Sequence, residues 1–482
     1  MKDAILKLFF LSFSLLYVHM AEAQVIQNGL KLKNDSLTYW YTGVIQHGYL
    51  LPVNDGYEAD LYGNNYGNQI QPLLLSNQGD VIWSEDPIKI NISPDEVAVG
   101  NYGEGEIKFT KAGETLKEAY QLASQVHFEC SGELPDEMLF SRPQYNTWIE
   151  LMYDQNQKDI LSYAHKIIEN DFPPGVFMID DNWQEDYGKW NFHPGRFPDP
   201  GKMIDELHDM GFKVMVWVCP FVSPDCDVFR DLERKGLLLK DESGGTKIIR
   251  WWNGYSGLID LSNPGGVEWF KSQLDLLIEE YGVDGFKLDA GDPEYYVGAV
   301  AYEEISPNAH SELFARIGLA YPLNESRANW KMGGQAIANR LRDKAHKWED
   351  LRTLVPNMIT AGLMGYAYSC PDMIGGGEFT SFLEGAIIDQ ELIVRSAQCH
   401  ALMPMMQFSV APWRILDSIH FQAVKEAVRL RENIWLTSCG WYTTPKRLAS
   451  PSCVQWNMSI LIPGMKRFQI NFLSVKNCWW LL

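Results

Sequence analysis

A lysine and an aspartate close a short apolar run in the middle of the chain, within the segment GVDGFKLDAGD. Phe286 and Leu288 are typical of a strand buried on both faces, so Lys287 and Asp289 are expected where this strand leaves the core. Enzymes built on α/β barrels carry their chemistry at that end of their strands. An aspartate that only opens a loop is the alternative, but a charged pair on a buried strand must be desolvated, which favours a functional role.

Polar and aromatic residues also follow the other segments that we expect to be strands. Carboxylates bind hydroxyl groups and indole faces bind sugar rings, so a pocket rich in both suits an uncharged, polyhydroxylated ligand. Trp148 and Trp217 are more typical of barrel packing than of a ligand platform. The complete set is Trp148 and Glu150, then Asp180, Asp181 and Trp183, then Trp217, then Arg327 and Trp330, then Asp372.

Hydrolysis of a sugar bond needs two carboxyl groups, one ionised and one protonated near neutral pH. The charge of Lys287 would keep Asp289 ionised, as a nucleophile requires. The partner is expected on a later loop, where the segment RLRDKAHKWEDL offers Asp343, Glu349 and Asp350. Spacing alone does not choose among these three.

Other kinds of chemistry lack support in the sequence. No His, Asp or Glu spacing resembles a metal site, there is no GxSxG motif, and no glycine-rich phosphate loop follows a strand. We therefore expect no metal and no cofactor. The net charge of -21 argues against a nucleic-acid partner and against an anionic membrane surface. The eight cysteines show no CxxC pairing, so neither a zinc site nor a disulfide framework is indicated.

Two regions must position these residues. Residues 24–135 alternate apolar and polar residues between Asn, Gly and Asp turns, which predicts an antiparallel β-sandwich. Its loop DLYGNNYG, residues 60–67, could reach a neighbouring site or lie only on the surface. Strands and helices alternate over residues 136–432, which predicts an α/β fold with a (β/α)8 TIM-type barrel. Seven strands can be assigned, the last three to ARIGLAYPLN, MGYAYSC and ALMPMMQF.

The two ends of the chain differ from the rest. Residues 1–23 are typical of a signal peptide, with Lys2 and Lys7 before an apolar run and Ala21-Glu22-Ala23 as the cleavage site. The mature protein is expected to be exported, to a periplasm or out of the cell, and a single uncleaved anchor is the alternative. The tail, residues 433–482, has no acidic residue, and we interpret it as frameshifted or mis-called rather than as a packing segment.

Together GVDGFKLDAGD, the IDDNW strand, RANWKMGGQ and PDMIGGG resemble glycoside hydrolase family 31, in its branch similar to myogenesis-regulating glycosidase and bacterial α-galactosidases. The resemblance implies a retaining, exo-acting α-glycosidase without a cofactor, acting on an oligosaccharide or glycoside. It also implies Asp289 as the nucleophile and Asp343 as the acid/base. The residues implied to line the first sugar subsite are Asp180, Asp181, Trp183, Arg327 and Asp372, and Lys287 is a further candidate for a sugar hydroxyl.

Structural roles remain open for two of these residues, namely a turn cap for Asp372 and a buried ion pair for Arg327. The sequence also departs from the family in two places. Gln407 and Ser409 stand where α-glucosidases of the family carry an Arg and a His, which favours galactose over glucose. No eighth strand and no C-terminal β-domains are found after Arg431. An α-glucosidase or α-xylosidase is the alternative activity, and a truncated, inactive carbohydrate-binding product is the alternative class. The sequence does not predict an oligomeric state.

Overall fold

The computed structural model describes residues 24–27, 29–102, 105–442, 456–460 and 468–472. The predicted signal peptide lies outside the described residues, as does most of the tail. Within the described segments, no helix is long and apolar enough to cross a membrane.

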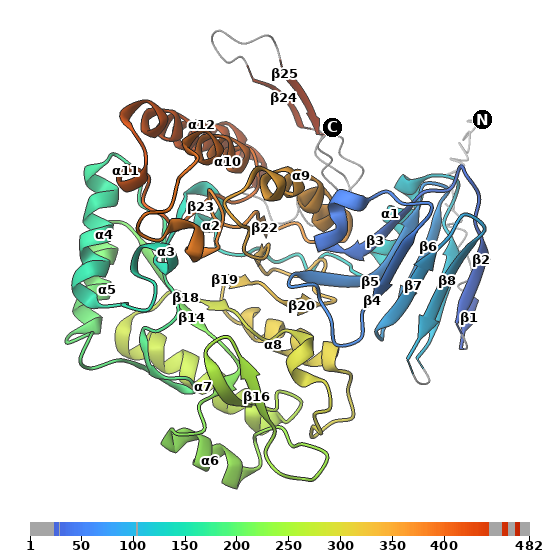
Figure 1. Ribbon diagram of the computed structural model, residues 1–482, viewed down its shortest axis with the longest axis horizontal. Helices are drawn as coiled ribbons and strands as arrows, with labels where there is room; N and C mark the ends of the chain where they lie inside the picture. The colour runs from blue at the N-terminus through green and yellow to red at the C-terminus, as the bar shows by residue number, and fades with distance from the viewer. Residues whose placement is uncertain (1–23, 28, 103–104, 443–455, 461–467, 473–482) are drawn as a thin grey trace, which may run out of the picture.

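Two antiparallel sheets lie at the N-terminal end of the molecule (Figure 1). Alternation of burial along their strands places Ile88, Ile90 and Ile92 between the sheets, as a strand with one buried face requires. The predicted antiparallel sandwich is confirmed. One sheet contains β1 (Gln24–Ile26), β3 (Trp40–Val44), β5 (Gln69–Ser76), β6 (Asp80–Ser84) and β9 (Ile107–Lys111), and the other contains β2 (Leu30–Lys33), β4 (Tyr57–Asp60), β7 (Ile88–Ile92) and β8 (Glu96–Asn101).

Eight parallel strands form a barrel next to the sandwich. A parallel bridge between Met373 and Gln407 joins the two ends of this sheet, so the barrel is nearly closed. In chain order the strands are β10 (Gln144–Asn146), β11 (Val176–Ile179), β14 (Lys213–Val218), β18 (Gly285–Leu288), β19 (Leu323–Ser326), β21 (Asn339–Arg340), β22 (Ser369–Cys370) and β23 (Gln407–Phe408).

The expectation that the barrel lacks its last strand is wrong. The strand that sequence analysis missed is the sixth, β21, which has only two residues, both of them polar. No helix separates it from β19. Once β21 is included, the segment that we assigned to the seventh strand becomes the eighth, β23, and the edge that we expected to be open is filled.

Two of the strands that we predicted from the sequence are longer than the strands in the structure. The first strand ends at Asn146, and Trp148 and Glu150 lie on the short helix α3 (Trp148–Leu151) that follows. The first four residues of ARIGLAYPLN belong to α8 (Pro307–Gly318), the next four connect the elements, and only its last two begin β19.

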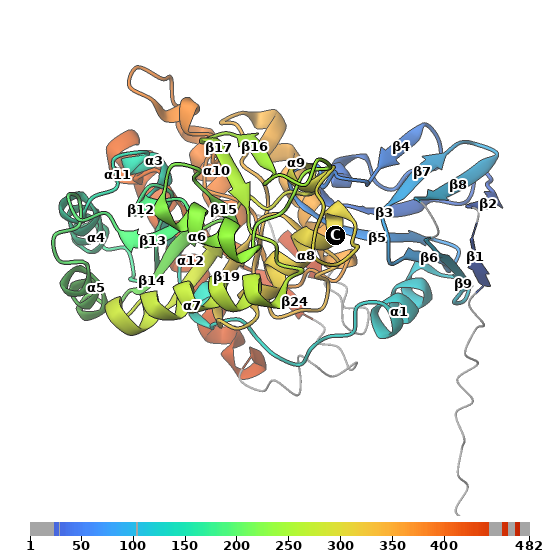
Figure 2. The same ribbon diagram turned by 90° about the horizontal axis from the view of Figure 1, so that it is seen from below.

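Helices cover the outside of the barrel, with α4, α5 and α7 packed in sequence along one side (Figure 2). Helix α7 (Pro264–Tyr281) shows why the chain enters β18 where it does. Asn263 caps its first turn, Pro264 occupies the first helical position, and Gly282 ends it in the left-handed conformation. The other barrel helices are α2 (Met138–Ser141), α4 (Gln157–Glu169), α5 (Pro200–Asp209), α9 (Trp348–Leu363), α10 (Gln390–Ala401), α11 (Pro412–Ile415) and α12 (Ser418–Tyr442).

Small insertions decorate the carboxyl ends of the strands, and sequence analysis did not resolve them. After β11 comes the hairpin β12 (Gln184–Asp186) and β13 (Lys189–Phe192), and after β14 comes the sheet of β15 (Phe221–Val222), β16 (Ile248–Trp251) and β17 (Gly254–Leu258) with α6 (Asp227–Lys235). The remaining elements are η1 (Ile45–Leu50), α1 (Leu116–Val126), η2 (Pro293–Tyr296), η3 (Phe379–Phe382) and the hairpin β24 (Trp456–Ile460) and β25 (Phe468–Phe472).

One strand from the barrel belongs to the sandwich. β20 (Asn329–Trp330) follows β19 and pairs in parallel with β5, so that Asn329 lies opposite Gln69. The indole of Trp330 is buried in the core of the sandwich. The two regions therefore share a sheet directly behind the predicted site.

Candidate active site

Asp289 emerges from β18 into a cluster of hydrogen-bond donors and positive charges. Its Oδ1 accepts a hydrogen bond from Nε of Arg327 at 2.7 Å, and its Oδ2 accepts one from the indole N–H of Trp217 at 3.0 Å. Nζ of Lys287 lies 3.8 Å from Oδ2. Burial alone would raise the pKa of Asp289, but Arg327, Lys287 and Arg340 together hold this pKa well below its ordinary value. Asp289 is thus an ionised carboxylate in a fixed orientation, as a nucleophile requires.

Lys287 makes its shortest ion pair with Asp180 rather than with Asp289. Nζ donates to Oδ2 of Asp180 at 2.7 Å, and both side chains are almost completely buried. Burial would lower the pKa of Lys287, but the charge of Asp180 raises it above its ordinary value, so the lysine remains charged. Asp180 therefore holds the cation that supports Asp289.

Arg327 is engaged mainly with the protein. Beyond its bond to Asp289, it donates to both carboxylate oxygens of Asp292, at 3.0 and 2.6 Å, and to the carbonyl oxygen of Gly67 at 3.1 Å. These four hydrogen bonds leave one of its five N–H groups for a ligand. The geometry favours the buried ion pair that sequence analysis kept open, with Arg327 orienting the carboxylate of Asp289.

Asp343 follows β21 and stands on the opposite side of the site. Its side chain is 46% exposed, and its Oδ1 accepts a hydrogen bond from Nη1 of Arg340 at 2.6 Å. The other two candidates lie elsewhere, since Glu349 is exposed beside Arg352 and Asp350 accepts a hydrogen bond from a backbone N–H. Of the three, Asp343 is the carboxylate that joins the cluster.

Asp372 binds Arg340, the same arginine that donates to Asp343. This buried carboxylate accepts a hydrogen bond from Nη1 of Arg340 at 2.9 Å and one from the backbone N–H of Lys344 at 2.8 Å. Its backbone has φ of 84°, which is strained for a residue other than glycine. Burial raises the pKa of the Asp372 carboxyl to about 6, because its effect outweighs the opposing charge of Arg340. Asp372 therefore fixes both ends of the segment that carries Asp343.

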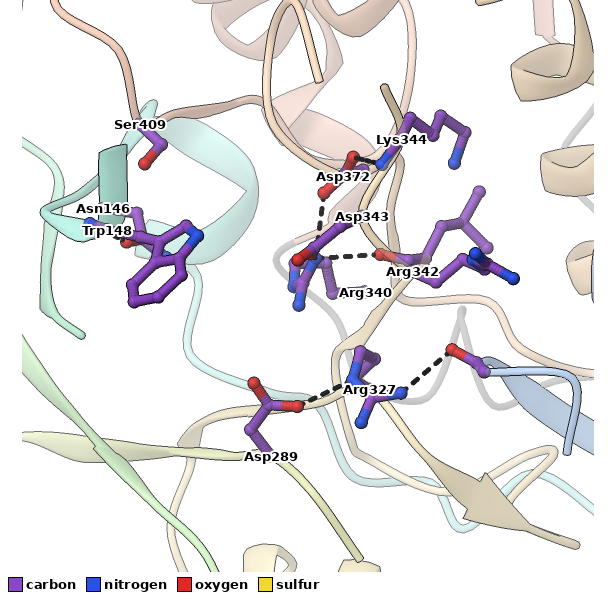
Figure 3. Close-up of polar contacts among 12 residues, drawn as sticks. Asn146, Trp148, Asp289, Arg327, Arg340, Arg342, Asp343, Lys344, Asp372 and Ser409 are labelled. Carbon is purple, nitrogen blue, oxygen red and sulfur yellow. Dashed lines mark hydrogen bonds and ion pairs between the residues drawn. The ribbon is translucent and has the colours of Figure 1, made fainter. Parts of the chain in front are cut away.

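The close-up shows that Asp289 and Asp343 point into one opening from two sides, and that the indole of Trp148 borders it on a third (Figure 3). A carboxyl group held ionised and a more exposed one thus face a common space. Two carboxyl groups that face one space are the type of group that glycoside hydrolysis uses.

Asp181 occupies a separate polar network beside this opening. It accepts hydrogen bonds from the hydroxyl of Tyr187 at 3.1 Å and from Nδ2 of Asn253 at 2.5 Å. Asn253 lies between β16 and β17, so the insertion after β14 contacts the site. Burial, together with the charge of Asp180, raises the pKa of Asp181 to about 7.

Trp183, a predicted sugar-binding residue, is completely buried in the hydrophobic core. Its indole N–H donates to the carbonyl oxygen of Trp217 at 2.8 Å, and Trp217 in turn donates to Asp289. Trp183 therefore supports Asp289 indirectly, through Trp217, and does not face the opening as a sugar platform. Glu150 pairs with Arg414, which ties α3 to the segment after β23.

The loop at residues 60–67 reaches the site, which settles the alternative that the sequence left open. Nδ2 of Asn65 donates to Asp292 at 3.0 Å, and the carbonyl oxygen of Gly67 binds Arg327. The sandwich thus contributes to the surroundings of Asp289 through Asp292 and Arg327.

Sequence analysis missed three charged residues of the cluster. Asp292 stands only three residues after Asp289, and an acidic residue so close to a candidate site residue was a signal that sequence analysis could have used. Arg340 and Glu325 lie on β21 and β19, inside the barrel, and no apolar pattern marks them. Burial raises the pKa of Glu325 to about 6, against the opposing charges of Arg340 and Lys287. Among the described residues, no group of three His, Cys, Asp or Glu side chains could hold a metal ion.

Such a barrel, with an N-terminal sandwich and two facing carboxyl groups at the carboxyl ends of its strands, is the architecture of a glycoside hydrolase. The sequence model described as "Glycosyl hydrolases family 31 TIM-barrel domain" matches residues 138–434, and the chain belongs to this family. The resemblance found in the sequence is confirmed.

Known relatives agree with this assignment. The chain is 26% identical over 419 residues to myogenesis-regulating glycosidase of Mus musculus, and the match covers 79% of this chain and 58% of the relative. It is 25% identical over 265 residues to the α-xylosidase XylQ of Lactiplantibacillus pentosus, and this match covers 50% of this chain and 32% of the relative. A dextranase of the family from Flavobacterium johnsoniae, complexed with glucose, has the same fold, with a TM-score of 0.74 at 15% identity, covering 87% of this chain and 56% of that one. The chain thus spans between a third and three fifths of the length of these relatives.

Proposed function

We propose that this protein is a retaining, exo-acting α-glycoside hydrolase that releases a terminal α-linked hexose. The observation that carries the proposal is the pair of facing carboxyl groups, with Asp289 held ionised by Arg327 and Lys287. Asp289 attacks the anomeric carbon while Asp343 protonates the leaving oxygen. Asp343 then removes a proton from the water that hydrolyses the glycosyl-enzyme.

Galactose is the sugar that we favour. The support is the family pattern at β23, where Gln407 and Ser409 replace an Arg and a His. Nε2 of Gln407 donates to Gln144 and Glu325, and Oγ of Ser409 accepts the backbone N–H of Ile149, so both side chains are neutral and bound within the barrel. An α-xylosidase or α-glucosidase is the second candidate, because XylQ and two other relatives are named as α-xylosidases.

The proposal is tested with 4-nitrophenyl α-galactoside, α-glucoside and α-xyloside and the purified chain. We expect turnover of at least one, with the galactoside fastest. A 5-fluoro glycosyl fluoride of the same sugar should label the peptide that contains Asp289, and Asp289→Asn should bind the substrate without turning it over. A wild-type chain that binds these sugars but neither hydrolyses nor reacts with them would instead support the non-catalytic class.

We also propose that the mature protein is exported, on the basis of the signal-peptide pattern in residues 1–23. N-terminal sequencing of the protein from its native host should give Gln24 as the first residue. A chain that retains Met1 and sediments with membranes would support the uncleaved anchor.

A further inference from the structure

The first residue of β5 bridges two segments of the barrel. Gln69 is completely buried, and its single Nε2 group donates to the carbonyl oxygen of Arg327 at 2.6 Å and to that of Arg340 at 2.7 Å. These carbonyl groups belong to the chain after β19 and to β21. A side chain of the sandwich therefore joins two neighbouring strand ends of the barrel.

The two bridged residues are those that hold the two catalytic carboxyl groups. The side chain of Arg327 binds Asp289, and the side chain of Arg340 binds Asp343. β19 and β21 themselves are paired only at Ser326 and Asn339. Past that pair, the amide of Gln69 is a direct link between the backbone that carries one arginine and the backbone that carries the other.

Two neighbours of Gln69 reinforce this link. Oδ1 of Asn68 accepts the backbone N–H of Arg342 at 2.6 Å, and the carbonyl oxygen of Gly67 accepts from the guanidinium of Arg327. The pairing of Gln69 with Asn329 fixes the backbone of β5 itself. Three consecutive residues of the sandwich thus contact the segments on both sides of the opening.

We propose that Gln69 is a positioning residue that sets the separation and orientation of Asp289 relative to Asp343, without touching the substrate. This inference rests on the proposed function, because it assigns the two carboxyl groups their roles. Displacement of a reacting group by 1 Å is enough to lower a rate by about 100-fold, so an amide that holds both sides of a site has a kinetic effect. Its effect is expected in kcat, since the sugar does not contact it.

The chain offers a matched control for this test. Gln71 lies two residues further along β5, is equally buried, and within the described part of the chain its side-chain amide has no hydrogen-bond partner. Gln69→Leu removes the two bridging bonds, whereas Gln71→Leu makes the same chemical change on the same strand and breaks none. Gln69→Glu keeps the shape of the side chain but places carboxylate oxygens against the two carbonyl oxygens.

Both Gln69 variants should lose about 10- to 100-fold in kcat on a disaccharide, with KM changed less than about threefold. The loss should be smaller by about tenfold on a 2,4-dinitrophenyl glycoside, whose leaving group does not need the proton of Asp343. Gln71→Leu should retain wild-type kcat on both substrates. A fall in melting temperature without a fall in kcat, or equal losses in all three variants, would overturn the inference.

A crystal structure of Gln69→Leu provides a measurement that does not depend on turnover. The segment that carries Asp343 should move relative to Asp289 by at least about 0.5 Å, which is the tolerance of a catalytic constellation. Unchanged separation of the two carboxyl groups overturns the inference even if the wild-type chain hydrolyses no glycoside. A wild-type chain without activity, combined with a displaced segment in the variant, refutes the proposed function alone.

Discussion

Replacing Arg327 with methionine removes the cation that binds Asp289 and Asp292 together. At the observed 2.7 Å, two unit charges attract by about 6 kcal/mol at an effective dielectric constant of about 20. The variant no longer has to bury the charged guanidinium, and this gain offsets part of the lost attraction. Removing one partner of a buried ion pair typically destabilises a protein by about 3–5 kcal/mol. We expect the unfolding free energy of Arg327→Met to fall by an amount in this range.

The same change should move the pH dependence of activity. The folded-state pKa of Asp289 lies below the value of about 3.9 for an unfolded chain, so its ionisation contributes stability above that pH, and this stability is lost as the pH falls through the folded pKa. Without Arg327 the folded pKa rises, because burial is then opposed by Lys287, Arg340 and the remaining hydrogen bonds but no longer by the charge in direct contact with Asp289. The acid limb of the profile of kcat/KM, which reports the ionisation of the nucleophile, should move to higher pH in Arg327→Met.

Urea unfolding at pH 7 and kcat/KM measured from pH 3.5 to 8 on an aryl α-glycoside check both effects. Lys331→Met is the matched control. This change also removes one positive charge, but Lys331 pairs with Glu85 and Glu312 rather than with Asp289. This control should leave the acid limb in place, because neither of the two ion pairs of Lys331 involves Asp289. An Arg327→Met variant with a wild-type acid limb would refute the electrostatic role that we assign to this arginine.

Three further changes probe the other parts of the site. Asp343→Asn should lower kcat/KM on a disaccharide by about 10²- to 10⁴-fold and restore much of the rate on a 2,4-dinitrophenyl glycoside, whereas equal losses on both would exclude a general-acid role. The raised pKa of Asp181 means that its ionisation destabilises the folded state as the pH rises from about 4 to about 7, so Asp181→Asn should lose less melting temperature than wild type between pH 5 and 8. Trp217→Phe removes one hydrogen bond to the ionised Asp289, which is worth about 1.5–3 kcal/mol, and should lower kcat by about 10- to 100-fold with little change in KM.

The parts of the fold that follow from local patterns were predictable. The helix before β18 carries its capping residues Asn263, Pro264 and Gly282 in sequence, and the strand after it is a short apolar run. Since the barrel places such a strand end at the catalytic face, Asp289 could be found from its own neighbours. The family resemblance then selected Asp343, which spacing had left among three candidates.

The parts that depend on tertiary contacts were not predictable in the same way. β21 contains Asn339 and Arg340, and an arginine can occupy a barrel strand only because acidic groups from β19 and the end of β22 neutralise it. Apolar periodicity, the main signal for a strand, is therefore absent there. Trp183 illustrates the converse case, since its type suits a sugar platform but its indole is buried behind Trp217.

The pairing of β20 with β5 has a consequence for how this chain is made. A ribosome releases the sandwich sequence first, yet one strand of that sheet is Asn329–Trp330, more than 200 residues beyond β9. Gln69 and Ile70 at the start of β5 can pair with β20 only after the fifth barrel strand has emerged from the exit tunnel, whereas the other partners of β5, β3 and β6, belong to the sandwich sequence. The rest of this sheet can therefore pair before the barrel is made, and the contact of Gln69 with Asn329, which ties the sheet to the barrel, is added late in synthesis.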